Sequence, residues 1–371
     1  MRCDLVIVGG GPAGLATAIH AAQRGREAIV FDRRELPLDK ACGEGVMPSG
    51  VAALERMGVE IPASARAAFA GIRYIDEARV AEGRFRNGVG WGVRRTALIE
   101  ALVARARMLG VELRYGSAVE RWRCTPDGVV VESEDGPLHA ALLVGADGLR
   151  SQVRRRAGLE RRWRGRQRVG LRCHFVMVPW STQVEVYWSD GAEAYVTPLG
   201  ADRINVAILW AGERATFSDL LRRFPRLSER LRGARAEGVV RGAGPFRQAV
   251  RRRYADRVAL VGDAAGYVDA ITGEGVSLGF RCAEALVDTV VHGRPLADYE
   301  ARYVQLSRAY YRVTGLLLLV ARWPRLRRRV LRVLAHDPDL FTHLLAISNG
   351  DEPCRARSFA PVLRRLALAA P

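Results

Sequence analysis

The stretch Leu5-Val6-Ile7-Val8-Gly9-Gly10-Gly11-Pro12-Ala13-Gly14 decides the fold of this chain of 371 residues. Its apolar first half is typical of a strand that is buried on both faces of a parallel sheet. The glycines occupy the G-x-G-x-x-G positions, which permit a tight turn, a close approach of backbone to pyrophosphate and close helix–strand packing. We therefore expect a helix N-terminus that binds dinucleotide phosphates. The predicted binding loop comprises Gly9, Gly11, Pro12, Ala13 and Gly14.

The residues after this loop continue the same pattern. Apolar residues recur at helical spacing between positions 15 and 22, and a second apolar strand at 28–31 ends on Asp32. A carboxylate about 20 residues beyond the glycines is where such folds hold the ribose hydroxyls. The sequence therefore predicts that Asp32, with the adjoining Arg33, belongs to a dinucleotide site.

Two further glycine-rich stretches each follow a predicted buried strand. They are Gly145-Ala146-Asp147-Gly148 and Val261-Gly262-Asp263-Ala264-Ala265-Gly266. One of the three stretches alone would be a weak signal. The three together, in this order, resemble the FAD-dependent monooxygenase and geranylgeranyl-reductase superfamily, and the resemblance covers roughly residues 1–295. The resemblance implies bound FAD and redox chemistry.

The resemblance also implies roles for particular residues. Asp263 should lie on the ribityl chain of FAD, and Asp147 with Gly148 near FAD and NAD(P)H. The family pattern V-x-R-x-x-L-x-x-x-L begins here at Val93, so Arg95 should contact FAD, with Arg94 as the neighbouring candidate. Gly262 of the third stretch should also contact the cofactor. The segment that ends in Gly273-Glu274-Gly275-Val276 should open a helix whose N-terminus faces the flavin and stabilises its reduced, anionic form. No second G-x-G-x-x-G is present, so NAD(P)H should bind transiently beside the flavin.

Two segments bear on the reaction. Lys40-Ala41-Cys42-Gly43 resembles the K-x-C-G segment of geranylgeranyl reductases, which lies beside the isoalloxazine, so Lys40 and Cys42 are expected at the cofactor. Cys42 is there either a proton donor, a substrate contact or a small apolar filler. Tyr195-Val196-Thr197-Pro198 resembles the W-V-F-P strand of the same reductases, with two added hydroxyls that favour a phenol or polyketide head group.

Hydroxylation of a phenol also benefits from a group that accepts its proton. Candidates on the predicted strands are His174, Glu185, Tyr187 and Tyr195, and each is also an ordinary strand residue. Glu274 either lies at the flavin or helps to cap its helix. Halogenation is disfavoured, because Lys40 is the only lysine and lies in the cofactor loop, and the W-x-W-x-I-P motif of halogenases is absent.

Composition limits the setting of the protein. The six cysteines are dispersed, which favours a reduced, cytoplasmic protein over a disulfide framework or a zinc site. We expect neither a signal peptide nor a transmembrane helix. The net charge of +18 comes almost entirely from arginine, and it favours a solvated surface, an acidic substrate or an anionic membrane over nucleic acid. An apolar stripe among arginines at 324–335 is either a peripheral membrane contact or a helix packed on its own domain.

These observations predict an α/β fold with a Rossmann-like, glutathione-reductase-type FAD domain, an inserted antiparallel substrate sheet and C-terminal helices. The expected function is NAD(P)H-dependent monooxygenation of a hydrophobic aromatic, phenolic-lipid or polyketide-like molecule in secondary metabolism. The alternative is reduction of isoprenoid double bonds, and a non-catalytic membrane-binding protein is a distant third. The oligomeric state is left open. The expected boundaries are 1–70, 93–160 and 250–295 for FAD, 71–92 and 161–249 for substrate, and 296–371 for the helices.

Overall fold

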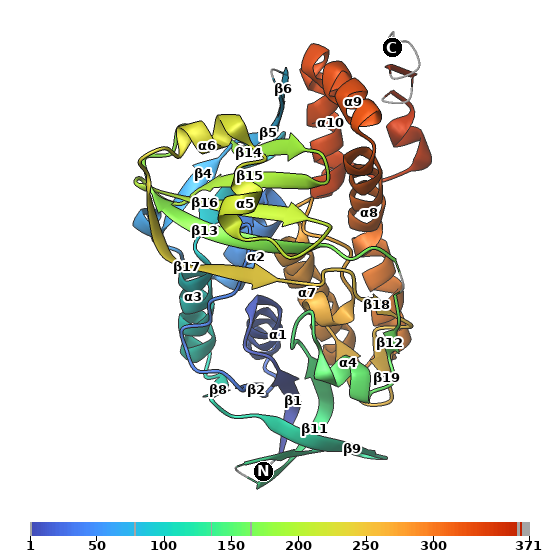
Figure 1. Ribbon diagram of the computed structural model, residues 1–371. Helices are drawn as coiled ribbons and strands as arrows, with labels where there is room; N and C mark the ends of the chain where they lie inside the picture. Colours follow the sequence, from blue (N-terminus) through green and yellow to red (C-terminus); the bar gives the residue numbers. More distant parts are fainter. Residues whose placement is uncertain (1, 78, 135, 164, 362–363, 366–371) are drawn as a thin grey trace.

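The structure, a computed structural model, describes residues 2–361 except 78, 135 and 164, together with residues 364 and 365. Its lower half in Figure 1 is built on a sheet whose centre is parallel. The order of the strands is β19-β20-β11-β1-β2-β8, and a hairpin of β9 and β10 pairs with the first part of β11. The strands of this sheet are β1 (Arg2–Val8), β2 (Ala28–Asp32), β8 (Glu112–Tyr115), β9 (Val119–Thr125), β10 (Gly128–Ser133), β11 (Gly136–Gly145), β19 (Tyr254–Ala255) and β20 (Val258–Leu260).

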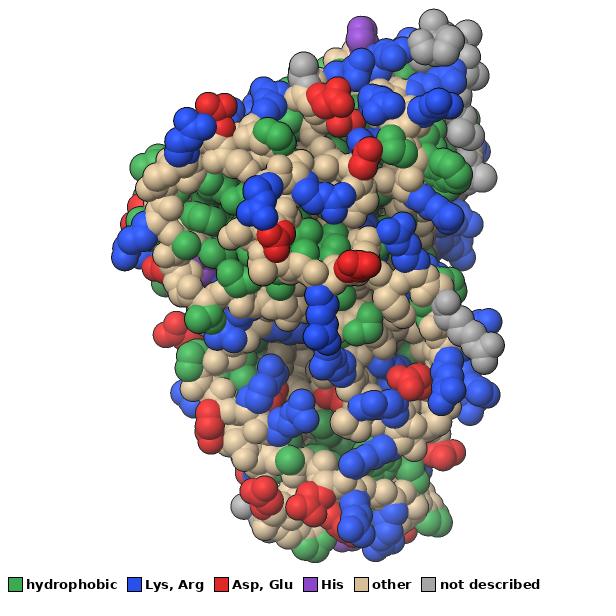
Figure 2. Space-filling model, in the orientation of Figure 1, with side chains coloured by type: hydrophobic (Ala, Val, Ile, Leu, Met, Phe, Trp, Pro, Cys, Tyr) green, Lys and Arg blue, Asp and Glu red, His purple; other side chains and the backbone are tan. Residues whose placement is uncertain are grey.

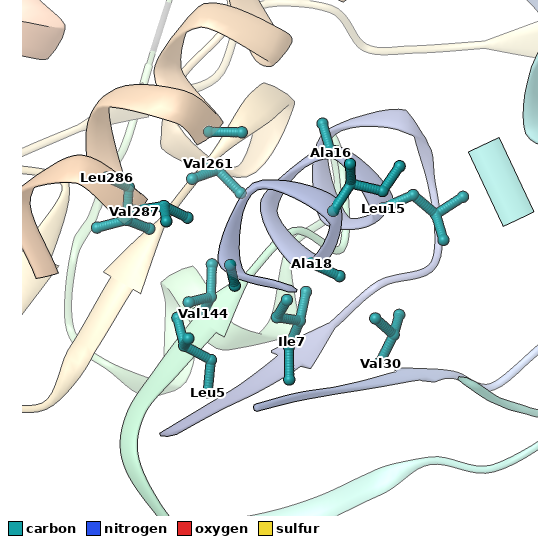
Figure 3. Close-up of a cluster of buried hydrophobic side chains, with 14 of the residues drawn as sticks. Leu5, Ile7, Leu15, Ala16, Ala18, Val30, Val144, Val261, Leu286 and Val287 are labelled. Atoms are coloured by element: carbon teal, nitrogen blue, oxygen red, sulfur yellow. The ribbon is translucent and has the colours of Figure 1, made fainter. Parts of the chain in front are cut away.

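Helix α1 (Pro12–Gln23) lies between this sheet and helix α7 (Gly275–Val291). Figure 3 shows its Leu15, Ala16 and Ala18 among side chains from β1, β2, β11 and α7. Burial of this apolar layer away from water is the main stabilising contribution to the domain. The expected strand–turn–helix unit is therefore present. The remaining helices of this half are α2 (Pro48–Met57), α3 (Arg95–Met108) and α4 (Gln152–Arg156), with short 3-10 turns η1 (Ala63–Ala65) and η2 (Gly262–Ala265).

A second sheet forms the upper half, with strand order β17-β13-β16-β15-β14-β5-β6. Its neighbouring strands are antiparallel, as expected, except that β14 and β5 run parallel. That pair joins segments about a hundred residues apart in sequence, which strand periodicity does not reveal. The strands are β5 (Gly71–Asp76), β6 (Arg79–Arg84), β13 (Val169–Val176), β14 (Val184–Ser189), β15 (Ala192–Pro198), β16 (Arg203–Trp210) and β17 (Arg235–Ala243), and helices α5 (Phe217–Leu221) and α6 (Pro225–Arg230) follow β16.

Small sheets connect the two halves. β7 (Gly90–Val93) pairs with β3 (Gly45–Val46) and β4 (Arg66–Phe69), apart from the seven-stranded sheet. β12 (Glu160–Arg161) pairs with β18 (Ala249–Val250). β7 leads directly into α3, so this small sheet places the first turn of α3 beside the loop that precedes β3.

The C-terminal helices stand against the edge of the upper sheet (Figure 1). Arg327 of α9 is buried and forms an ion pair of 3.0 Å with Asp76 at the end of β5. Phe341 of α10 packs against Tyr74, with ring centroids 4.6 Å apart. None of the helices in the described part of the chain is long and apolar enough to cross a membrane. The helices are α8 (Leu296–Arg322), α9 (Pro324–His336) and α10 (Pro338–Asn349), followed by the 3-10 turn η3 (Ala356–Phe359).

Candidate active site

A cavity of about 1390 Å³ runs from the first glycine loop to the C-terminal helices. Its volume exceeds that of a pocket for one drug-sized ligand, about 300–1,000 Å³. There is therefore room for a dinucleotide and a second molecule. All the predicted cofactor-binding residues line this cavity except Gly14, which lies in the helix behind the loop.

The first glycine loop fits the pyrophosphate of a dinucleotide. A Cβ atom at Gly11 would meet nothing within 4 Å, and Gly11 faces the cavity at the N-terminus of α1. Gly9 has φ +116°, and a Cβ atom at Gly14 would lie 1.9 Å from the carbonyl oxygen of Gly9. Gly9 therefore makes the turn, Gly14 permits close packing, and Gly11 leaves space where phosphate would bind.

Asp32 lies at the end of β2 on the wall of this part of the cavity. Its carboxylate accepts the Gly10 backbone N–H at 3.0 Å and is paired with the Arg34 guanidinium at 3.1 Å. Arg33 is exposed and lines the same wall. The sequence analysis did not single out Arg34, since nothing in the pattern distinguishes it from its neighbour.

The other two glycine-rich stretches meet across the cavity. The Lys40 ammonium forms an ion pair of 3.3 Å with Asp263, and a Cβ atom at Gly148 would lie 3.5 Å from the same nitrogen. One oxygen of Asp147 accepts the backbone N–H groups of Gln152 and Val153, while its other oxygen is buried with no protein partner. Asp147 thus accepts the first two N–H groups of α4, whose N-cap is Ser151, and leaves one acceptor oxygen for a ligand.

The side chains of Arg95 and Cys42 lie side by side on the wall of the cavity. The Arg95 Nη2 donates to Cys42 Sγ at 3.3 Å, and the Glu44 backbone N–H donates to the same sulfur at 3.3 Å. The Nε and Nη1 atoms of Arg95 are buried without a protein partner. A buried guanidinium with free N–H groups is costly unless a ligand satisfies it. Arg95 therefore fits a cofactor oxygen, and Arg94 instead forms an ion pair with Glu237.

The structure does not place His174 at the cavity wall, contrary to the role expected of it as the group that accepts a substrate proton. Its Nε2 lies 2.6 Å from the Glu44 carboxylate, and its Nδ1 faces guanidinium groups of Arg172 and Arg94 at 3.2 and 3.4 Å. Guanidinium only donates, so Nδ1 accepts and Nε2–H donates to Glu44. Both ring nitrogens thus have hydrogen-bond partners, and His174 orients Glu44. The sequence analysis assigned no role to Glu44.

The hydroxyls of the strand at 195–198 are also occupied. Tyr195 lines the cavity, but its hydroxyl donates to the carbonyl of Ile271 at 3.1 Å, and burial beside Glu193 raises its pKa well above the ordinary value. The Thr197 hydroxyl donates to the carbonyl of Gly43 at 2.8 Å. These hydroxyls hold the strand against the cofactor loops. Contact of these hydroxyls with a phenolic head group stays a prediction. The Tyr187 hydroxyl donates to Glu185 at 2.7 Å, and neither residue lines the cavity.

Glu274 is a buried acid on the cavity wall at the N-terminus of α7. It stands at the N-cap position, yet its side chain makes no capping hydrogen bond. Desolvation by burial raises its pKa to about 8, while Arg281 lowers it and Asp351 adds to the rise. Glu274 can therefore hold a proton near neutral pH beside the predicted flavin position, which fits a group that exchanges protons with a ligand.

The shifted pKa of Glu274 predicts a pH dependence of stability. The folded protein holds this proton more tightly than the unfolded chain, whose carboxyl titrates near the ordinary value of 4.5. The free energy of unfolding should therefore fall as pH rises from about 4.5 to about 8, by on the order of a few kcal/mol. Glu274→Gln should remove this contribution and be the more stable protein at pH 8. Denaturant titrations across this range test it, and parallel profiles of the two proteins would contradict it.

Toward the C-terminal helices the cavity becomes an apolar lobe, which lies between these helices and the upper sheet. Its sheet side carries aromatic and β-branched residues, and its helix side carries the stripe of α9 that the sequence shows among arginines. That stripe faces the cavity, so α9 packs on its own domain. The lobe is lined by Ile72, Tyr74, Phe85, Val184, Val186, Trp188, Leu317, Val320, Leu326, Val330, Leu331, Leu334, Phe341, Leu344 and Leu345.

The fold and the fit of the cavity to a dinucleotide define an FAD-dependent oxidoreductase. The chain belongs to the FAD binding domain family, whose model matches residues 2–291.

Among relatives, the chain is 28% identical to menaquinone reductase of Mycolicibacterium smegmatis over 335 residues, which cover 84% of this chain and 81% of that protein. It is also 28% identical to digeranylgeranylglycerophospholipid reductase 2 of Methanopyrus kandleri over 327 residues, 82% of this chain and 81% of that protein.

Solved structures share the fold at low sequence identity. A flavoprotein/dehydrogenase from Cytophaga hutchinsonii matches with a TM-score of 0.84 and 18% identity, covering 96% of this chain and 95% of that one. A variant of halogenase PltM in complex with FAD matches with a TM-score of 0.78 and 17% identity, covering 98% of this chain and 86% of that one. The anhydrotetracycline hydroxylase OxyS of Streptomyces rimosus matches with a TM-score of 0.74 and 24% identity, covering 94% of this chain and 76% of that one.

Proposed function

We propose that this protein reduces isoprenoid double bonds in a lipid, the alternative that the sequence analysis kept open. The observation that carries this proposal is the apolar lobe, which continues directly from the cofactor part of the cavity. Long prenyl chains are flexible and carry no polar groups along their length, so they suit a wide apolar cavity rather than a polar pocket. The relatives named for menaquinone and digeranylgeranyl lipids support the same substrate class.

Saturating an alkene requires a hydride on one carbon and a proton on the other, so the π bond breaks and two C–H bonds form. Reduced FAD, when it is bound, supplies the hydride, which carries both electrons. We assign the proton to the thiol of Cys42, which lines the cavity. The Arg95 guanidinium and the Glu44 N–H both donate to its sulfur, so they stabilise the negative charge left after proton transfer.

Positioning of this thiol depends on residues around it. The Asn205 side-chain amide donates to the carbonyl of Cys42 at 2.9 Å, and Thr197 donates to the next carbonyl, that of Gly43. Glu44 has φ +58° and accepts the backbone N–H of Arg95 at 2.9 Å. The loop at 42–44 is thereby held against the upper sheet and α3 at once.

Electrons would come from NAD(P)H bound transiently at the mouth of the cavity. Arginines line the cavity near the second glycine-rich stretch and offer positive charge to nucleotide phosphates. Arg150 and Arg156 belong to this group, and Arg33 and Arg34 line the same cavity beside Asp32. We place the enzyme in a reducing, cytoplasmic setting, which fits the absence of disulfides among its six cysteines.

Aromatic hydroxylation has less support. The likeness to a hydroxylase extends to the fold alone, and the hydroxyls of Tyr195 and Thr197 are bound to backbone carbonyls. His174, the expected acceptor of a phenol proton, is buried behind Glu44.

Product analysis separates these functions. The FAD-loaded protein is incubated with NADPH and either menaquinone or a geranylgeranyl phospholipid without oxygen, and the lipids are examined by mass spectrometry. We expect a product that carries two additional hydrogen atoms in the prenyl chain. Menadione, which has the same ring without a prenyl chain, should gain none in carbon–carbon bonds. Unchanged prenyl chains, together with an aromatic substrate that gains one oxygen atom in air, would overturn the proposal.

A further inference from the structure

Helix α8 presents an exposed apolar patch near its C-terminal end. Leu316, Leu319 and Trp323 are 45%, 49% and 55% exposed, although large apolar side chains are normally covered. The spacing of three and four residues places them on one face of the helix and the turn that follows it. We call these three residues the α8 patch. A contiguous apolar patch of this kind marks an interaction site.

The α8 patch is continuous with the apolar lobe. Leu316 and Leu319 line the cavity as well as the surface, and Val313 and Val320 on the same helix line it too. Residues of one helix thus contribute both to the α8 patch and to the wall of the cavity. The C-terminal end of α8 lies beside α9 and α10 at one end of the molecule, away from the first glycine loop (Figure 1).

The sequence around the α8 patch is basic. No acidic residue lies between Glu300 and Asp337. One arginine of this span, Arg327, is buried against Asp76. Figure 2 shows basic and hydrophobic side chains together over the C-terminal helices at upper right. The other arginines of the span are Arg302, Arg308, Arg312, Arg322, Arg325, Arg328, Arg329 and Arg332.

We infer that the α8 patch and its arginines dock on an anionic lipid bilayer, from which the lipid substrate enters the cavity. The inference rests on the proposed function, because it supplies the route for a substrate that dissolves in membranes. Tryptophan favours the membrane–water interface, and leucines beside it would enter the acyl region. Arg322, whose guanidinium lies 5.7 Å from the Trp323 ring centroid, would meet the headgroups. An apolar patch within a basic stretch suits an anionic bilayer better than a second, equally basic copy of this chain.

Vesicle binding tests the inference directly. The FAD-loaded protein is sedimented with vesicles of phosphatidylglycerol or of phosphatidylcholine. We expect strong binding to the anionic vesicles that weakens with added salt. Replacing two arginines at the patch, Arg322→Ala with Arg325→Ala, should weaken binding about 25-fold, which is about fivefold for each arginine.

The matched control replaces two exposed arginines of the upper sheet region, Arg222 and Arg232, which are 73% and 80% exposed. Their double alanine variant carries the same net charge as the patch variant and should bind like the unmodified protein. Equal weakening of the two variants, or equal binding to both lipids, would overturn the docking site. The protein could instead fail to bind vesicles and form concentration-dependent dimers that Trp323→Ala abolishes. That result would show that a second copy covers the patch, and it would overturn the docking site too.

Activity assays separate this inference from the proposed function. In detergent, where substrate is delivered without a membrane, the patch variant should reduce a prenyl lipid as fast as the unmodified protein. In phosphatidylglycerol vesicles the same variant should be slower by about the factor that vesicle binding loses. If neither the unmodified protein nor the patch variant reduces a prenyl lipid in detergent, the proposed function fails. Vesicle binding still tests the docking site in that case.

Discussion

Gly11→Glu is expected to yield a folded protein that has lost its FAD. A Cβ atom at Gly11 meets nothing within 4 Å, so the backbone accepts a side chain without strain. The added carboxylate would occupy the space for pyrophosphate at the N-terminus of α1 and repel it. Like charges in contact cost several kcal/mol, so FAD affinity should fall by more than about 100-fold. The FAD-to-protein ratio after gel filtration, read from the visible flavin absorbance, measures the effect.

Gly14→Ala is the informative comparison for this variant. A Cβ atom at Gly14 would lie 1.9 Å from the Gly9 carbonyl oxygen, so the helix and the turn must separate. Gly14→Ala should therefore lose FAD together with thermal stability, whereas Gly11→Glu should lose FAD while its circular dichroism spectrum stays unchanged. A Gly11→Glu protein that remains fully yellow would contradict the assignment of the cofactor cradle.

Cys42→Ala is expected to abolish alkene reduction while FAD stays bound. General acid catalysis contributes about 100- to 10,000-fold to rate, and no other thiol among the described residues lines the cavity. The reduction of the flavin by NADPH precedes proton transfer to substrate, so its rate should be unchanged. Single-turnover measurements that follow flavin reduction and lipid product separately test this split.

Cys124→Ala is the matched control, because Cys124 is exposed on β9 and far from the lobe in sequence and in sheet position. It should retain full activity. If Cys42→Ala reduces prenyl lipid at the unmodified rate, the proton comes from elsewhere, and Glu274 becomes the next residue to test.

Much of the cofactor half was predictable from sequence, because its determinants are local. The turn at Gly9, the close contact at Gly14 and the strand that ends at Asp32 all follow from residue type and spacing within about 25 residues. The placement of Cys42 and Lys40 at the cavity depended on a resemblance, and the structure brings both to its wall. Whether they touch FAD remains a prediction that binding measurements with variants can test.

The substrate half was less predictable, because its determinants are contacts between distant segments. The stripe at 324–335 has the same pattern whether it faces a bilayer or a protein core, and only packing against β5 and β6 turns it inward. Likewise, the hydroxyl of Tyr195 suggested a substrate contact until its partner, the carbonyl of Ile271, was placed. The position of His174 behind the cavity wall was unpredictable for the same reason, since its partner Glu44 lies 130 residues away in the chain.

The most direct test of the account follows the flavin itself without oxygen. The FAD-loaded protein is reduced with one equivalent of NADPH and mixed anaerobically with menaquinone or with a geranylgeranyl phospholipid in detergent, while the visible flavin absorbance is recorded. The account predicts that the geranylgeranyl lipid, which has no quinone ring to accept electrons, reoxidises the flavin in step with loss of one double bond. Reduced flavin that persists with this lipid, but is reoxidised by oxygen with hydroxylation of an aromatic compound, would contradict the central claim.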